Sequence, residues 1–83
     1  MNCWNVSRKG RVLSVNVDRD AVSQGEGDAI VSAVSSEASL RDFDVVHVTG
    51  PMLRDPPDGT LRLLRALGAV ANQHGKLLEI GPI

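Results

Sequence analysis

Two aspartates, Asp55 and Asp58, are the side chains best placed for chemistry in this chain. Between and after them, residues 56–59 read Pro-Pro-Asp-Gly, which interrupts regular structure, and the leucine-rich sequence from Thr60 predicts a helix. Two carboxylates near a helix start could perform acid–base catalysis if burial raised the pKa of one of them, a condition that surface aspartates seldom meet. The simplest role for Asp58 is that of helix N-cap, with its carboxylate accepting hydrogen bonds from backbone N–H groups.

The other reactive side chains form no catalytic or metal-binding pattern. Cys3 is the single cysteine, so an internal disulfide and a cysteine-based zinc cluster are both excluded. His47 and His74 have no carboxylate or thiol at metal-ligand spacing, and each has a structural role available, in a strand and at a helix end respectively. Ser23 and Thr60 lack a neighbouring base. We therefore expect no catalytic residue, no metal and no cofactor.

Length and composition predict one small domain, residues 1–83. The chain is 42% hydrophobic, which is enough for a modest core. Nine basic and ten acidic residues give a net charge of −1 without a run of either sign, so a nucleic-acid partner is not expected. No apolar run is long enough to span a bilayer, and no leader peptide follows Met1. These features predict a cytoplasmic protein.

The first half of the sequence predicts a β-hairpin followed by a helix. Residues 3–6 and 11–17 are rich in strand-forming residues and are separated by a turn that contains Gly10. Alternation places Leu13, Val15 and Val17 on the face of the second strand that points to the core. Residues 18–27 are polar and contain two glycines, which predicts a loop, and residues 28–38 have helical spacing with Asp28 as the N-cap.

The second half predicts a strand, a helix and a strand. Residues 44–49 are a β-branched run, residues from Thr60 to His74 have apolar positions at helical spacing, and residues 76–80 form a short final strand. Such a βαβ unit has parallel strands and a right-handed crossover. The predicted order is ββαβαβ, an α/β fold with a mixed sheet and helices mainly on one face.

The segments 58–64 (DGTLRLL) and 75–82 (GKLLEIGP), with the helix between them, resemble the STAS domains, a family that includes the anti-sigma factor antagonists. In that family a strand leads through an aspartate-serine-serine-glycine loop into a leucine-rich helix, then into a strand that closes with Gly-Pro. The order of the preceding elements agrees, so the resemblance covers nearly the whole chain. Two features depart from the family: its usual C-terminal helix is missing, and Pro57 and Asp58 stand where the two serines would be.

The resemblance implies a non-catalytic regulatory module that binds an anti-sigma kinase-like protein. The residues it assigns to partner binding are Arg54, Asp55, Asp58, Gly59 and Thr60. One of the family's loop serines is phosphorylated, and a carboxylate supplies only part of a phosphate's charge, so Asp58 would imitate the modified state permanently and incompletely. Thr60 is an alternative acceptor for phosphate.

Two further roles are compatible with the sequence. The first is a self-associating subunit, a homo-oligomer, because a small core without the final helix leaves apolar strand surface to cover. The second is a domain that binds a small ligand through the Asp55 and Asp58 segment, or an enzyme that uses these two carboxylates. A concave pocket with converging polar groups would favour the second role, whereas an exposed loop on a convex surface would favour a regulatory module.

Overall fold

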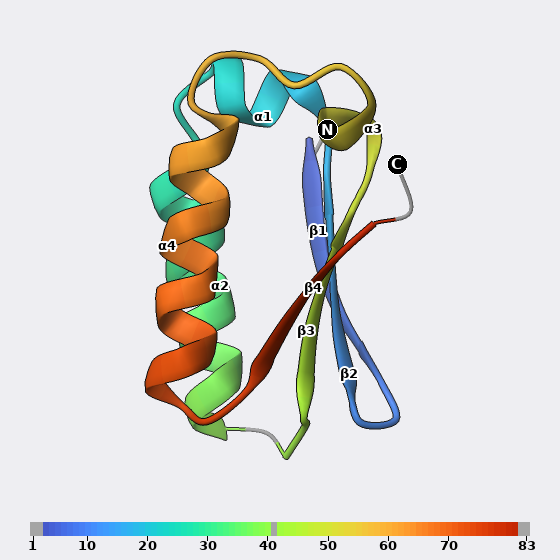
Figure 1. Ribbon diagram of the computed structural model, residues 1–83, viewed down its shortest axis with the longest axis vertical. Coiled ribbons are helices and arrows are strands. Elements are labelled where there is room, and N and C mark those ends of the chain that lie inside the picture. The colour runs from blue at the N-terminus through green and yellow to red at the C-terminus, as the bar shows by residue number, and fades with distance from the viewer. Residues whose placement is uncertain (1–2, 41, 82–83) are drawn as a thin grey trace.

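The computed structural model describes residues 3–40 and 42–81, except for the side chain of Leu40. A four-stranded sheet is packed against two long helices, with two short helices at one end (Figure 1). The elements in chain order are β1 (Trp4–Lys9), β2 (Val12–Val17), α1 (Arg19–Ser23), α2 (Gly27–Leu40), β3 (Val45–Thr49), α3 (Pro51–Arg54), α4 (Thr60–Gln73) and β4 (Leu77–Ile80).

The sheet is mixed, with strand order β1-β2-β3-β4. The hairpin strands β1 and β2 are antiparallel, whereas β2 and β3, and then β3 and β4, are parallel. Both α2 and α4 lie on the same side of the sheet (Figure 1). The expected α/β fold with helices mainly on one face is therefore confirmed, as is the parallel βαβ unit formed by β3, α4 and β4.

Alternation along the central strands fills the core. Leu13, Val15 and Val17 of β2 are fully buried, as the sequence predicted, and so are Val46 and Val48 of β3. The helices contribute a second layer to the same core. The buried apolar residues of the helices are Ala21, Ile30, Val34, Met52, Leu53, Leu63, Leu67 and Ala71. Phe43, which precedes β3, is also fully buried, and Lys76 Nζ lies 4.9 Å from its ring centroid.

Short helices form in residues 18–27, which were expected to be a loop, and between residues 49 and 60, where no regular structure was expected. Residues 19–23 form α1, and the Asp18 side chain accepts a hydrogen bond from the backbone N–H of Arg19 at 2.9 Å. Residues 51–54 form α3, which begins with a proline at its first turn. Helices of four or five residues are too short to produce a periodic pattern, and tertiary packing of Ala21, Met52 and Leu53 stabilises them.

Other boundaries differ by a few residues. The first strand continues through Lys9, so the hairpin turn is at Gly10, which has φ +62°. The helix α2 begins at Gly27, one residue before the expected cap, so Asp28 lies in its first turn. The helix α4 ends as expected, with His74 as C-cap and Gly75 at φ +71°.

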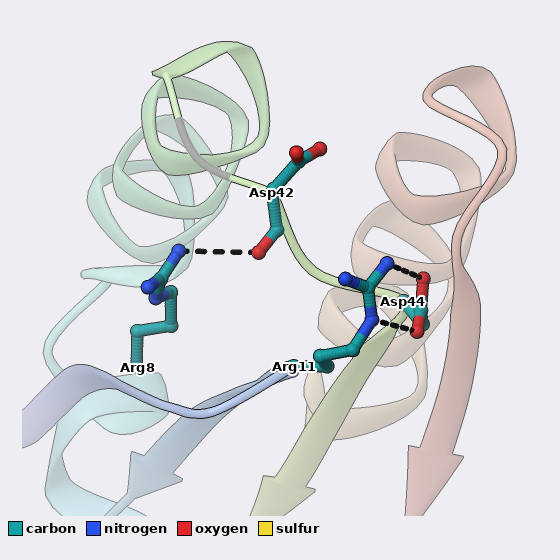
Figure 2. A network of polar contacts seen from close by, with 4 residues as sticks. All are labelled: Arg8, Arg11, Asp42 and Asp44. Carbon is teal, nitrogen blue, oxygen red and sulfur yellow. Dashed lines mark hydrogen bonds and ion pairs between the residues drawn. The ribbon is translucent and has the colours of Figure 1, made fainter.

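Polar contacts join the hairpin turn to the start of β3, at the end of the sheet farthest from α1 and α3 (Figure 2). Arg11 donates two hydrogen bonds to the Asp44 carboxylate, at 2.5 and 2.8 Å, and Arg8 donates one to the Asp42 backbone carbonyl at 3.1 Å. The hydrogen bonds from Arg11 lower the pKa of Asp44 and raise that of Arg11. Arg8 and Arg11 thus both have intramolecular partners.

Among the described residues, none of the helices combines the length and the apolar character that crossing a membrane requires.

Candidate functional site

The predicted partner-binding residues lie together at the end of the molecule that carries α1 and α3 (Figure 1). Arg54 is the last residue of α3, Gly59 is the N-cap of α4, and Thr60 is the first residue of α4. The segment between them connects α3, the short helix that follows β3, to α4. Arg54, Asp55, Asp58 and Gly59 are exposed, and we call these four residues the loop surface.

The position of this loop depends on Gly50, which follows β3. Its φ is +121°, and a side chain there would collide with the backbone of Val17 at the end of β2. This close approach turns the chain into α3, whose Met52 and Leu53 are buried in the core. The loop surface is therefore carried by an anchored segment.

Asp58 is not the N-cap of α4, which corrects the role expected from the sequence. The cap is Gly59, with φ +95°, and no side chain accepts a hydrogen bond from the first turn of the helix. The Asp58 carboxylate lies one residue too early to reach the N–H groups that a capping side chain satisfies. Because Asp58 is exposed and makes no hydrogen bond or ion pair within the described structure, its charge faces solvent.

Thr60 differs from the other four predicted residues because it is buried, with 5% of its surface exposed. Its Oγ1 donates a hydrogen bond of 2.8 Å to the carbonyl of Pro57, and its backbone N–H bonds to the same oxygen at 3.2 Å. Thr60 therefore holds the turn that presents Asp58 and Gly59. In this conformation its hydroxyl is not accessible to a protein kinase.

Gly59 contacts the neighbouring helix α1. A Cβ at this position would lie 3.3 Å from Val22 Cγ1, and the positive φ is a conformation that other residues rarely adopt. A second contact to α1 is made by Asp55, whose carboxylate lies 3.4 Å from the Arg19 guanidinium. Both side chains of this pair are more than half exposed, so the ion pair orients the loop without contributing much stability.

A shallow groove opens beside Gly59, between the amino-terminal ends of α2 and α4. Asp28 lines one wall and Arg62 the other. Further lining comes from Val22, Gly25, Gly27, Val31, Leu63 and Ala66. The sequence analysis missed Arg62, although its position three residues after Gly59 places it on the same side of the helix. The participation of α2 could not be inferred from local sequence, since it depends on how the two helices pack.

The acid–base interpretation required a buried carboxylate at Asp55 or Asp58. Both side chains are exposed, and Asp55 is paired with Arg19. Neither carboxylate is therefore buried, as the acid–base interpretation required. Within residues 3–40 and 42–81, no three His, Cys, Asp or Glu side chains are close enough together to hold a metal ion.

His47 lies in β3, on the sheet face opposite the helices. Its Nε2 donates a hydrogen bond to the backbone carbonyl of Gly81, immediately after β4. The side chain therefore joins β3 to the end of β4, consistent with the structural role expected for a single strand histidine.

Comparison with known proteins gives little further information. No protein-family model matches the chain, and no curated protein matches it. Among solved structures, Pseudomonas aeruginosa AtuE is similar over 95% of this chain and 39% of its own chain, with a TM-score of 0.42 and 15% sequence identity.

Proposed function

We propose that this protein is a non-catalytic, cytoplasmic interaction module of a regulatory system, similar in role to an anti-sigma factor antagonist of the STAS family. Its loop surface binds a kinase-like anti-sigma protein. The observation that carries the proposal is the exposure of Arg54, Asp55, Asp58 and Gly59 on an anchored turn at the start of α4. This is the position at which the family resemblance implies partner contacts.

Acidic side chains surround the loop surface and would attract basic groups of a protein partner over long range, whereas at residue 58 itself the STAS logic implies that negative charge opposes close contact. Six of the ten acidic residues lie on or beside α1, the start of α2 and the loop surface, together with three arginines. The six are Asp18, Asp20, Glu26, Asp28, Asp55 and Asp58. Most are exposed, so a partner of opposite charge would be attracted before contact.

The carboxylate of Asp58 gives the loop a permanent negative charge. In the STAS logic the unmodified serine form binds its partner and the phosphorylated form does not. A carboxylate carries about −1 charge where a phosphoserine carries about −1.5 to −2, so Asp58 reproduces part of the effect of the modification. We propose that the protein is held near the weakly binding state.

The test is a comparison of wild type with Asp58→Ser. Binding to purified anti-sigma kinase domains is measured by calorimetry, and phosphorylation by the same kinases is followed by mass spectrometry. Since Asp58 does not cap α4, the substitution changes charge without removing a helix cap. We expect the variant to bind about fivefold more tightly, as removal of about 1 kcal/mol of unfavourable charge interaction implies, and to become phosphorylated at residue 58.

A matched control is Asp42→Ser, which removes another exposed aspartate, at the opposite end of the molecule. It should leave binding unchanged. Identical behaviour of wild type and Asp58→Ser in both assays would contradict the proposed role of this position. Equal effects of the two substitutions would instead show a nonspecific dependence on net charge.

A further inference from the structure

The strand β4 is an open edge of the sheet with unpaired backbone groups. Leu77 and Gly81 donate backbone hydrogen bonds to Asp44 and Val48, each 3.0 Å long. Because alternate residues of a strand direct their N–H and C=O groups to the same side, those of Leu78 and Ile80 point away from β3. Within the part of the chain that the structure describes, no strand follows β4 on that side. Such an edge can hydrogen-bond to another strand.

The exposed large apolar side chains follow this same edge. Among the described residues they are Leu61, Leu77 and Ile80, which are 62%, 70% and 46% exposed. Leu77 and Ile80 belong to β4 itself. Leu61 lies two turns before Gly68 on α4, and a Cβ on Gly68 would be 3.4 Å from Leu78 Cδ2, so Leu61 lies on the side of the helix that borders β4.

The two edges of the sheet differ in character. The other edge strand, β1, carries the exposed charges of Arg8 and Lys9, a common means of preventing association between strands. The strand β4 has a single charge, Glu79, between apolar residues. Of the two edges, β4 is therefore the one suited to pairing.

We propose that β4 and the adjoining side of α4 form a two-fold symmetric interface with a second copy of this chain. The two β4 strands pair antiparallel and join the two sheets into one of eight strands. A second copy fits because the outward groups of Leu78 are a donor and an acceptor, which an identical Leu78 across a two-fold axis satisfies reciprocally.

The charge of Glu79 selects the register. Centring the two-fold axis on Leu78 places Glu79 opposite Leu77 of the second copy, on the sheet face away from the helices. A shift by one residue would centre the axis on Glu79 and place two carboxylates directly opposite each other, which is unfavourable. In the favoured register Gly68, above Leu78, lets the two α4 helices approach closely.

A strand of four residues alone would bury too little surface for a stable dimer, for which about 1,200 Å² of total buried surface is needed. The adjoining side of α4, including Leu61, supplies the additional contact. We therefore expect moderate affinity and a concentration-dependent dimer.

The first experiment is sedimentation equilibrium from micromolar to millimolar protein concentration. We expect wild type to dimerise and Ile80→Lys to raise the dissociation constant about tenfold or more, because a cation would be buried at the interface. The matched control is Ser7→Lys, which adds the same charge to the exposed β1 edge. A monomer at every concentration, or equal weakening by both variants, would overturn the proposal.

A cross-linking experiment tests the register and remains informative if Ile80→Lys folds poorly. In a Cys3→Ser background, Leu77→Cys and Glu79→Cys proteins are oxidised separately and as a mixture. The favoured register places these two positions opposite each other, within the Cα separation that a disulfide spans. An intermolecular disulfide that forms efficiently only in the mixture is expected. Its absence from the mixture, or efficient cross-linking of either variant alone, would overturn this arrangement.

Discussion

At the scale of single residues, backbone geometry at Gly50 and Gly59 determines where the loop surface lies. Both have positive φ, and both approach a neighbouring segment, the backbone of Val17 for Gly50 and the side chain of Val22 for Gly59. The sequence indicates a break in regular structure at both positions, since Gly50 ends a β-branched run and Gly59 precedes a helix. It could not identify the segment that each glycine contacts, since those contacts join residues far apart in sequence.

Gly50→Ala should destabilise the fold by about 3 kcal/mol, because it combines backbone strain with a collision that neighbouring backbone atoms cannot relieve. Gly10→Ala is a suitable control. Its φ is also positive but nothing lies within 4 Å of the added carbon, so strain alone should cost about 1 kcal/mol. Urea unfolding of the two variants measures the difference, and equal losses would show that the contact with Val17 is unimportant.

The ion pair between Arg11 and Asp44 should give stability a small dependence on acid pH. The hydrogen bonds from Arg11 lower the pKa of Asp44 below its usual value of 3.8, so the pair's contribution is present above that value and is lost as the pH falls through the lower pKa of the folded state. Wild type should therefore exceed Asp44→Asn in stability at neutral pH, by a modest amount because both groups are exposed.

Urea unfolding at about pH 7 and about pH 3 checks this expectation, with the advantage of wild type shrinking at the lower pH. Asp42→Asn is the control, since Arg8 bonds to the backbone carbonyl of Asp42 and its carboxylate takes no part in the contacts of Figure 2. A difference between wild type and Asp44→Asn that stays constant with pH would argue against a role for the pair.

At the scale of elements, long periodic segments were predictable and short ones were not. The alternation in β2 and the helical spacing in α4 each identify a buried face, because burial selects apolar residues at fixed intervals. The helices α1 and α3 carry no such pattern, and they form because Gly50, Asp18 and buried packing define their ends. The candidate site shows the same difference. Its residues could be located from the predicted start of a helix, but the pairing of Asp55 with Arg19 could not be predicted, because it depends on where α1 lies.

The two faces of α4 should respond differently to the same substitution. Leu67 is fully buried, so Leu67→Ala removes core packing and should cost about 3 kcal/mol. Leu61 is mostly exposed, and at a low protein concentration where the chain is monomeric Leu61→Ala should change stability by less than about 0.5 kcal/mol. Thermal or urea unfolding measures both, and similar losses would contradict the observed orientation of the helix.

At the scale of the whole molecule, three parts of the surface differ in position and character. The carboxyl end of β3 and the start of α4 present the loop surface, the hairpin turn is held to β3 by the contacts of Figure 2, and β4 forms an apolar edge. Since the loop surface and the side of α4 that borders β4 are distinct, a dimer formed through β4 could still bind a partner through each loop. The proposed partner binding and the proposed self-association therefore use different residues.

The most direct test of the proposed function is a residue-level map of partner binding. A ¹⁵N-labelled sample of the protein, at 8.8 kDa well suited to such spectra, is titrated with an unlabelled anti-sigma kinase domain while amide resonances are followed. The account predicts that the largest changes fall on Arg54, Asp55, Asp58, Gly59 and the adjoining residues of α1, and that Asp58→Ser tightens binding. Changes confined to β1 or to the exposed face of the sheet, with the loop amides unmoved, would contradict it.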